Sequence, residues 1–420
     1  MSPALLIRLK AAGPWAFGAR DAGRDQVNSL YGSDSLYSAV TLATGQLGFL
    51  PEWLSATAGE ESPAAAFTSL FPFQGDTLFA PPPLNLWPPP ASVVTTPSPV
   101  FFAKMRWSAA RFVPLTLIES IVTGQKVLAD QWIPDAESGC LLRRDRPSSS
   151  PFRVSARTSA AVDRITGRSG APNTAACIDF EPGAGLWGVV RFRDENAEST
   201  WSGRVEAAFR LLGDTGFGGR RRRGWGQTET PEFQRGAWPE LLIPKLKRVA
   251  ERGGDPHSSS EPGLYWLLSL FCPSKADRID WSGGEYQLRV RGGRVDGSGS
   301  DKKKLRMISE ASVVAAVVDP VGAAVHTAPD GFPHPAYRSG FAVSVLLPRV
   351  ETALDQTLVQ APSEVEAPEP KPCPAEQPQQ ASPDEDAEAG TTSAAIEQLS
   401  PAADGQEPDH PPSTEASDEI

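Results

Sequence analysis

The chain has 420 residues, enough to form two or more hydrophobic cores. Its four cysteines, Cys140, Cys177, Cys272 and Cys373, show no C-x-x-C spacing, which argues against a zinc site or a disulfide framework. No apolar run reaches the length of a signal peptide or of a membrane span, so we expect a cytoplasmic protein with no membrane contact.

The formal net charge of −11 is unevenly distributed along the chain. Residues 351–420 hold 17 acidic residues and one lysine, a net charge of −16. Subtracting these from the totals of 51 and 40 leaves 34 acidic and 39 basic residues in the rest, a net charge of +5. The last 70 residues also contain eleven prolines and no aromatic residue. We therefore predict a disordered, acidic, proline-rich tail after a mildly basic body.

The beginning of the chain predicts a strand followed by a helix. Residues 4–9 are mostly aliphatic and favour a strand, and Ser33 or Asp34 is a suitable N-cap for a helix. One face of that helix is apolar, through Leu36, Val40, Ala43 and Leu47. Proline-rich and aromatic segments between residues 67 and 90 favour extended structure, and residues 91–150 are expected to be an irregular insertion with some short helix.

A second strand-and-helix pattern follows this insertion. Residues 152–157, 177–180 and 186–192 favour strands, the last two around a turn at residues 181–183. Apolar residues at helical spacing then run from Val205 to Leu212, and Gly213 is expected to stop the helix. A returning strand over residues 228–233 completes the order β-α-β-β-α-β, which is typical of a ferredoxin-like module.

The remaining body predicts a second, strand-rich part of the protein. Strand candidates lie at residues 264–271, 286–291, 302–308, 312–318 and 341–347. We expect an α+β fold with two ferredoxin-like (RRM-like) modules that carry insertions. The expected boundaries are 1–235 for the N-terminal domain, 236–350 for the C-terminal domain and 351–420 for the disordered acidic tail.

The most distinctive segment is residues 216–226, Gly-Phe-Gly-Gly-Arg-Arg-Arg-Arg-Gly-Trp-Gly, here called the Gly/Arg loop. Glycines permit positive φ and close backbone approach, and arginine guanidinium groups match phosphate geometry. The tryptophan offers a face on which a base can stack. Because the loop follows the second predicted helix, we expect it to overhang the sheet.

Catalytic and cofactor motifs are missing from the sequence. The four histidines, His257, His326, His334 and His410, all lie far from the first predicted helix, and the acidic residues show no metal-ligand spacing. The Gly/Arg loop lacks the ending of a P-loop and precedes a strand rather than following one. We expect no catalytic residue, no metal and no cofactor.

Binding of RNA is the function that the basic residues favour, although a solvated surface rich in ion pairs remains the alternative. The hypothesis is that arginines contact phosphates and that Trp225 stacks on an unpaired base. The predicted RNA-binding residues are Arg20, Arg24, Ser33, Arg157, Arg164, Gly216, Gly218, Gly219, Arg220, Arg221, Arg222, Arg223, Gly224, Trp225 and Gly226.

Several segments resemble a known family. The Gly/Arg loop is similar to the C-terminal glycine-rich loop of RAMP proteins of CRISPR-Cas systems. Further similar segments, in the same order as in the family, are residues 31–39, 70–73 with 81–83, 161–167, and 307–313 with 334–340. Together they resemble the fourth subunit of the type III-A (Csm) effector complex, over about residues 5–347. Ala311 stands where the family pattern has glycine.

The resemblance implies a non-catalytic subunit that holds the repeat-derived 5′ tag of the crRNA. It also implies docking to the large polymerase-nuclease subunit and to a backbone RAMP subunit. Three alternatives remain open from the sequence: a RAMP endoribonuclease that processes repeat RNA, the equivalent 5′-tag subunit of a type III-B complex, and a basic scaffold that contacts only protein.

Overall fold

The computed structural model describes residues 2–18, 27–90, 93–95, 107–145, 150–246, 262–295 and 298–348. The chain divides into two compact units, 1–353 and 354–420, and every described residue belongs to the first. The predicted tail over residues 351–420 thus lies outside the described residues. Among the residues that are described, no helix combines the length and the apolar character needed to cross a membrane.

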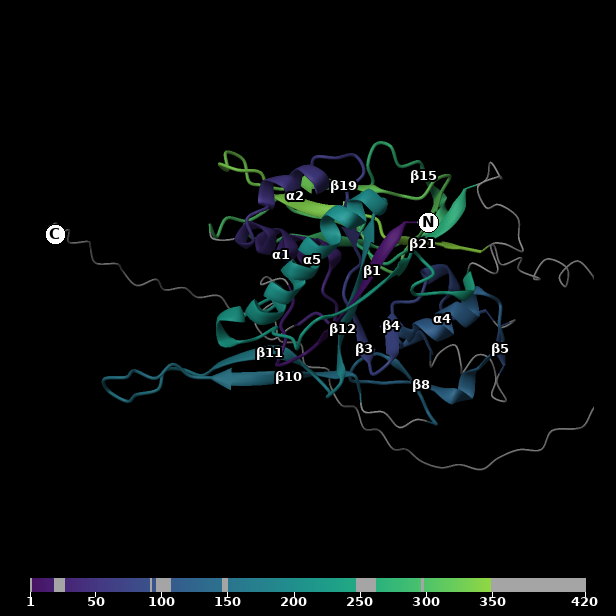
Figure 1. Cartoon of the computed structure of the whole chain (residues 1–420). Coiled ribbons are helices and arrows are strands. Elements are labelled where there is room, and N and C mark those ends of the chain that lie inside the picture. Colours follow the sequence, from purple (N-terminus) through teal and green to yellow (C-terminus); the bar gives the residue numbers. More distant parts are fainter. Residues whose placement is uncertain are drawn as a thin grey trace, which may run out of the picture. The chain divides into compact units, whose positions relative to one another are not determined.

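Within the described residues, seven strands form one sheet in the order β13-β1-β12-β3-β4-β6, with β2 also paired to β12 (Figure 1). Strand β1, next to the edge strand β13, pairs antiparallel with both β12 and β13, and its aliphatic residues Leu5, Ile7 and Leu9 are buried. The strands span Pro3–Lys10 (β1), Ala65–Phe67 (β2), Phe71–Gln74 (β3), Thr77–Ala80 (β4), Val113–Pro114 (β6), Ala184–Phe192 (β12) and Glu232–Ala237 (β13).

Two helices lie in the connections between strands of this sheet and pack against it. Helix α1 (Ser33–Gln46) follows β1, and helix α5 (Glu195–Thr215) leads from β12 to β13. The two helices contact each other, and α5 also contacts β1 and β12. The short helix α2 (Leu50–Thr57) follows α1, and its Trp53 packs against Trp201 of α5 with ring centroids 5.3 Å apart.

The structure corrects the predicted ends of both helices. Gly32 is the N-cap of α1, and neither Ser33 nor Asp34 caps it, because their side chains are engaged elsewhere. Helix α5 begins ten residues before Val205, where Asp194 accepts a hydrogen bond from the Ala197 amide. It ends at Gly216, whose φ is +90°, rather than at Gly213, which lies within the helix.

Short elements fill the predicted insertion, and a long hairpin follows it. The short helix expected in residues 91–150 is present as α4 (Leu115–Val122). Small strands surround it, namely β5 (Val94–Thr95), β7 (Val127–Leu128), β8 (Trp132–Pro134) and β9 (Leu141–Arg143). Strands β10 (Phe152–Ser159) and β11 (Asn173–Phe180) form an eight-residue antiparallel ladder that runs outward from the sheet (Figure 1).

The C-terminal part of the described chain is built from strands. One sheet has the order β15-β18-β14-β21, and two hairpins pair β16 with β17 and β19 with β20. The strands span Gly263–Leu267 (β14), Ile279–Glu285 (β15), Leu288–Arg291 (β16), Leu305–Ile308 (β17), Val313–Ala316 (β18), Gly322–His326 (β19), Tyr337–Phe341 (β20) and Ser344–Leu347 (β21). Residues 262–295 and 298–348 contain no helix, so the prediction of a second ferredoxin-like module gains no support.

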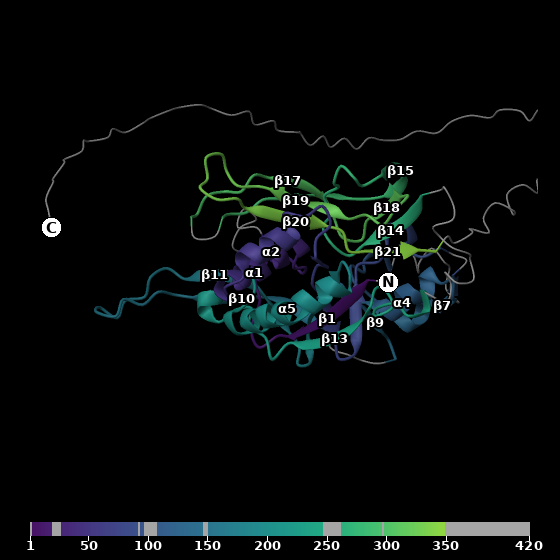
Figure 2. The same ribbon diagram turned by 45° about the horizontal axis from the view of Figure 1, so that its top comes forward.

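One hydrophobic core joins the C-terminal strands to the first sheet. Helix α1 lies between α5 on one side and strand β20 on the other (Figure 2). The ring of Tyr37 in α1 packs edge-on against Phe341 in β20, with centroids 6.2 Å apart. Trp266 and Val345 are fully buried in the same cluster as Leu5 and Phe209. The core therefore extends across residue 235 without interruption.

Ala311 offers a test of local backbone strain. It lies between β17 and β18 with φ of +72°, a conformation that costs an L-residue about 1–2 kcal/mol and costs glycine nothing. We expect Ala311→Gly to raise the free energy of unfolding by about 1 kcal/mol, since glycine relieves the strain but loses more entropy on folding. Urea denaturation measures the change. As the control, Ala315→Gly within β18 should lower stability, and a decrease for both variants would contradict the argument.

Candidate nucleic-acid interface

The Gly/Arg loop is tied to the segment that follows β1. Phe217 is fully buried and stacks on Trp15 with a centroid distance of 5.4 Å and an interplanar angle of 10°. The amide of Gly226 donates to the Pro14 carbonyl at 2.9 Å, and the amide of Gly219 donates to the Ala16 carbonyl at 2.8 Å. These contacts hold both ends of the loop in place, so it is not a free turn.

Close backbone approach explains the glycines of the loop. A Cβ atom added to Gly226 would lie 2.0 Å from the Phe217 carbonyl oxygen, and one added to Gly218 would lie 2.5 Å from the Ala16 carbonyl oxygen. Both glycines also have positive φ, +80° and +74°. The glycine pattern is therefore required by the path of the loop, whatever the loop binds.

The four arginines of the loop have two different roles. Arg220 adopts a left-handed conformation with φ of +59°, and its guanidinium group lies 5.3 Å from the centroid of the Trp225 ring. Arg221, Arg222 and Arg223 form a single 3-10 turn and are exposed. Among the described residues, none of these three pairs with a carboxylate. Their three guanidinium groups thus lie in solvent, although that of Arg223 also donates to the Ser159 hydroxyl.

Trp225 does not offer the stacking face that was predicted. Its side chain is 8% exposed and packs with Ala175 and Cys177 of β11, while Arg220 lies over the ring. A base would have to displace these neighbours before it could stack there. Trp225 instead anchors the Gly/Arg loop on the β10–β11 hairpin. Burial of its large apolar ring removes apolar surface from water and so stabilises this contact.

The β10–β11 hairpin carries the predicted residues Arg157 and Arg164. Arg157 is exposed on β10 and donates to the Asp179 carboxylate at 2.9 Å, an interaction that raises the pKa of the guanidinium group. Arg164 is exposed in the connection between the two strands, next to Ile165, which is 95% exposed. Arg223 of the loop donates to the Ser159 hydroxyl at 2.9 Å, so the loop and the outer end of β10 lie together.

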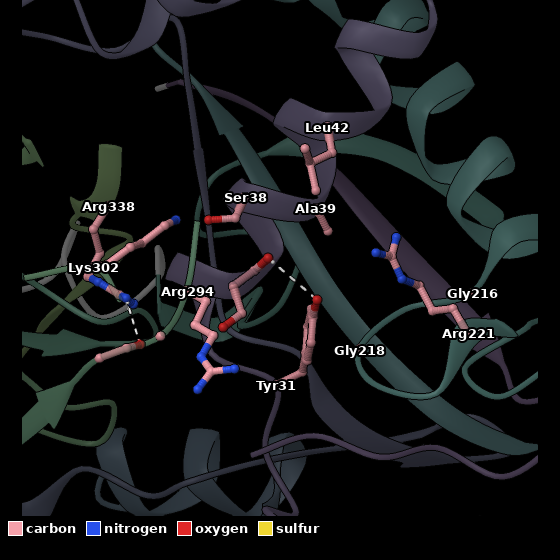
Figure 3. A pocket seen from close by; sticks show the side chains of 13 residues that line it. Tyr31, Ser38, Ala39, Leu42, Gly216, Gly218, Arg221, Arg294, Lys302 and Arg338 are labelled. Carbon is pink, nitrogen blue, oxygen red and sulfur yellow. Dashed lines mark hydrogen bonds between the residues drawn. The ribbon is translucent and has the colours of Figure 1, made fainter. Parts of the chain in front are cut away.

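A pocket of about 210 Å³ opens beside the Gly/Arg loop (Figure 3). Helix α1 lines it on one side, and Arg221 of the loop reaches it from another. Further cations come from Arg294 and Lys302, in the connection between β16 and β17, and from Arg338 of β20. Tyr31, Ser35 and Ser38 add hydroxyl groups, and the remaining lining residues are Ala39, Leu42, Gly216, Gly218, Gly292 and Gly293.

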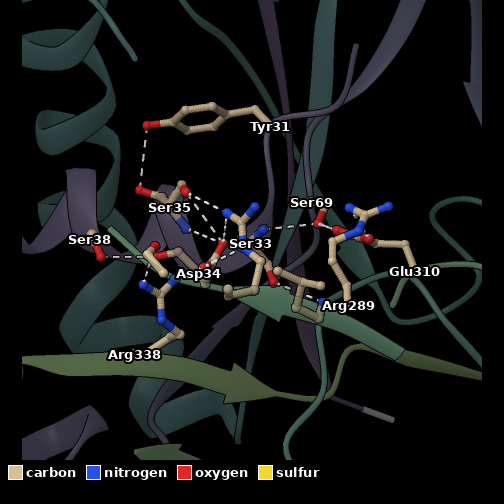
Figure 4. A network of polar contacts seen from close by, with 12 residues as sticks. Tyr31, Ser33, Asp34, Ser35, Ser38, Ser69, Arg289, Glu310 and Arg338 are labelled. Carbon is tan, nitrogen blue, oxygen red and sulfur yellow. Dashed lines mark hydrogen bonds and ion pairs between the residues drawn. The ribbon is translucent and has the colours of Figure 1, made fainter. Parts of the chain in front are cut away.

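A buried carboxylate with two arginines holds one wall of this pocket in place (Figure 4). Asp34, at the start of α1, is fully buried. It accepts hydrogen bonds from Arg291 at 2.7 and 3.0 Å and also from Arg338. Burial by itself would raise the pKa of Asp34, but the two guanidinium groups outweigh it and the pKa lies below its ordinary value. The pairing joins α1 to strands β16 and β20.

A second buried network contains Ser33, which was predicted to bind RNA. Ser33 is 2% exposed; its hydroxyl accepts a hydrogen bond from the Leu270 amide at 3.0 Å, and its amide donates to the Ser69 hydroxyl at 2.9 Å. Ser69 in turn bonds to the Glu310 carboxylate, which pairs with Arg289 (Figure 4). Ser33 thus connects parts of the fold and is not accessible to RNA. Arg20 and Arg24 lie outside the described residues.

The pocket contains residues that the sequence analysis did not select. Arg294 and Arg338 are more than 60 residues beyond the Gly/Arg loop in sequence, and neither lies in a basic run. Tyr31 and Arg338 do occur in the segments that resemble the RAMP family. That resemblance was the one signal pointing to them, because it marked residues 31–39 and 334–340 without assigning them a role.

Comparison with known proteins supports the resemblance. Residues 260–347 match the family model described as the CRISPR Csm4 C-terminal domain, whereas no curated protein matches the chain in sequence. A chain of the Csm3–Csm4 subcomplex of the type III-A CRISPR-Cas interference complex is similar in structure, with 14% identity, a TM-score of 0.51 and coverage of 82% of this chain and 99% of that one. A chain of a Csm1–Csm4 cassette in complex with cA4 gives 17% identity and a TM-score of 0.48, over 82% and 98%. The family-model match supports the resemblance over residues 260–347, and the first structural similarity shows a shared fold.

The charge cluster around Asp34 predicts a pH-dependent effect on stability. Asp34→Asn leaves the buried Arg338 and the partly buried Arg291 without this counter-charge, and we expect it to lower the free energy of unfolding by about 3–5 kcal/mol at neutral pH. The pKa of Asp34 is lower in the folded state than in the unfolded state. The difference in free energy of unfolding between the wild type and the variant is therefore complete above the unfolded-state pKa of about 3.9, and it shrinks as the pH falls through the folded-state pKa. Urea unfolding at neutral and acidic pH measures both effects.

Asp301→Asn is the matched control for this experiment. Asp301 pairs with Arg294 at 3.1 Å, but its side chain is 80% exposed, so the substitution should change stability little at any pH. Equal losses for the two variants would show that the burial of Asp34 has no special importance.

Neighbouring glycines give a second test. Gly218→Ala places a methyl group 2.5 Å from the Ala16 carbonyl at positive φ, whereas Gly219→Ala places one at an ordinary 3.5 Å. We expect Gly218→Ala to destabilise the protein by about 1–3 kcal/mol and Gly219→Ala to change stability little, as measured by thermal and urea unfolding. Similar results for both variants would mean that the loop has a different path.

Proposed function

We propose that this chain is the Csm4 subunit of a type III-A CRISPR-Cas effector complex and that it binds the repeat-derived 5′ tag of the crRNA without catalysing a reaction. The observation that carries the proposal is the Gly/Arg loop, which presents Arg221, Arg222 and Arg223 to solvent with no carboxylate partner among the described residues. Arg294 and Arg338 add positive charge on the facing wall of the adjacent pocket. Such a surface attracts a phosphate backbone.

The arrangement of the sheet fits the same proposal. The chain passes through β1, α1, β3, β12, α5 and β13, and the inner strands lie in the order β13-β1-β12-β3. We propose that residues 1–235 form the ferredoxin-like module expected of a RAMP protein, with β13 extending to residue 237. The strand-rich residues 236–350 then form the C-terminal domain. Within this module the Gly/Arg loop lies between the second helix and the last strand.

The chemistry of the pocket favours a binding role over cleavage of RNA. Cleavage needs a group that exchanges a proton with a ribose hydroxyl near neutral pH. Burial, followed by the neighbouring Asp34 charge, raises the pKa of Tyr31 to about 12, which makes Tyr31 a poor acid or base under these conditions. The arginines that line the pocket remain charged and suit the binding of phosphate.

The partners belong to the proposal as well. In the family that the chain resembles, this subunit docks the large polymerase-nuclease subunit and a backbone RAMP subunit. We propose the same two partners here, Csm1 and Csm3, in a cytoplasmic complex. Co-expression of the tagged chain with both proteins, followed by size-exclusion chromatography, should yield a complex whose RNA begins with a fixed repeat-derived sequence. RNA of random 5′ sequence would contradict the role in holding the tag.

Replacement of the exposed arginines tests the RNA contact directly. In the triple variant Arg221→Ala, Arg222→Ala, Arg223→Ala, the dissociation constant for single-stranded tag RNA should rise by at least tenfold. The slope of log affinity against log salt concentration should become shallower by about 2, since each phosphate contact on a single strand contributes about 0.7. Fluorescence anisotropy over a salt series measures both quantities.

A charge-matched control separates the position of these arginines from their charge. Arg144, Arg278 and Arg306 are exposed and lie outside both the Gly/Arg loop and the pocket. Replacing these three by alanine removes the same charge and should leave most of the affinity intact. Equal loss in the two triple variants would mean that RNA is held by net charge alone, and the assignment of the loop would fail.

A further inference from the structure

Large apolar side chains cover the solvent-facing side of β16. Tyr286, Leu288 and Val290 recur at every second residue and so lie on one face, and Leu288 and Val290 are each 61% exposed. Trp281 of β15, which is 44% exposed, packs edge-on against Tyr286 with ring centroids 5.3 Å apart. These four residues are here called the apolar stripe.

Ion pairs on the inner face of β16 determine which side chains face the solvent. Arg289 pairs with the buried Glu310 at 3.3 Å, and Arg291 pairs with the buried Asp34 at 2.7 Å. A shift of the strand by one residue would remove both arginines from these carboxylates. A half-buried strand usually turns its aliphatic side inward, and β16 does the reverse. An exposed apolar surface of this kind marks a site of contact with another molecule.

The chemistry around the stripe favours a protein over RNA. Arg306 lies directly opposite Val290 in the β16–β17 ladder and therefore on the same face. Tryptophan, tyrosine and arginine are the residue types that contribute most at the centre of protein interfaces. Leu288 has no planar face for a base, and the rings of Trp281 and Tyr286 meet at 67° instead of forming a parallel platform.

The charges near the stripe define its partner further. Arg306 is exposed, as is Lys304 two residues earlier, and neither pairs with a carboxylate among the described residues. The exposed carboxylates nearest in sequence, Asp280 and Glu285, belong to β15 at the other end of the stripe. The outward face of the β16–β17 hairpin has no carboxylate of its own. A second copy bound through this face would bring only cations, so the charges favour a different protein with carboxylates at its edge.

We infer that the apolar stripe is the docking surface for another protein, which places apolar side chains on Leu288 and Val290 and a carboxylate beside Arg306. The inference rests on the proposed function, because the occupant is taken to be one of the two protein partners named there. Figure 2 shows β15 and β17 at the outer side of the C-terminal strands, away from α5 and β1. The stripe and the Asp34 pairing lie on opposite faces of β16, so the occupant leaves the pocket beside α1 open.

The test measures binding of the full-length chain to purified Csm1 and to purified Csm3 by biolayer interferometry. In the double variant Leu288→Ser, Val290→Ser, the dissociation constant for one of these proteins should rise about tenfold or more, because two apolar contacts are lost. Both side chains already lie largely in water, so the variant should fold, and circular dichroism checks this. The affinity for tag RNA should stay unchanged.

The role of Arg306 is tested by its charge. Arg306→Glu should slow association with the same protein about threefold at low salt, and the difference should disappear as the salt concentration rises. An equal effect at all salt concentrations would contradict the predicted contact with a carboxylate.

The matched control is the double variant Leu128→Ser, Ile133→Ser. These two aliphatic residues lie in β7 and β8 and are 50% and 43% exposed, so the same kind of surface is removed away from the stripe. The control should bind both proteins as the wild type does. Equal losses for the two double variants, or no loss of affinity for either protein in the stripe variant, would overturn the inference.

Other occupants give different results. If tag RNA binds more weakly to the stripe variant while both protein affinities are unchanged, RNA covers the stripe and the inference is wrong. It is also wrong if light scattering shows a wild-type dimer that the stripe variant abolishes without any change in the two affinities. If the wild-type chain binds neither protein, the proposed partners and this inference fail together. If the wild type and the stripe variant bind both proteins equally well, only the docking surface is wrong.

Discussion

The arrangement of the protein depends on one buried carboxylate and its two arginine partners. Asp34 lies in the first turn of helix α1, while Arg291 and Arg338 come from strands β16 and β20, more than 250 residues later. A fully buried carboxylate is strongly unfavourable alone, so the chain must bring these cations to the helix when it folds. The same pairing fixes the distance between α1 and the C-terminal strands. Those two elements form the walls of the pocket, and the binding surface therefore has a defined shape.

Much of the local structure could be predicted because it depends on neighbours in sequence. The aliphatic run before residue 10 predicted β1, and apolar spacing predicted the existence of α1 and α5. The ends of these helices were predicted less well. Gly213 was expected to stop α5, but the helix continues for two residues, because the residue with positive φ that ends it is Gly216. A glycine permits a helix to end without requiring it to do so.

The candidate site could be predicted only in part, because burial and distant pairing decide it. The sequence indicated the basic loop, and the structure shows three of its four arginines exposed beside a pocket. It did not indicate that Trp225 and Ser33 would be buried, since an aromatic ring or a hydroxyl group in a polar segment can face either way. Arg294 was not selected at all. Its position depends on the packing of distant strands against α1, and no local sequence pattern indicates this packing.

The continuous core has a consequence for how this protein loses its structure. Trp266 and Val345 pack in the same cluster as residues of the first sheet, so neither part can expose its apolar surface alone at low cost. Unfolding of the C-terminal strands should therefore be coupled to unfolding of the first sheet through this shared core. A truncated chain that ends after β13 would keep the Gly/Arg loop and still lack a stable native state. Loss of core side chains in the C-terminal strands would then destabilise the whole subunit, and not one domain alone.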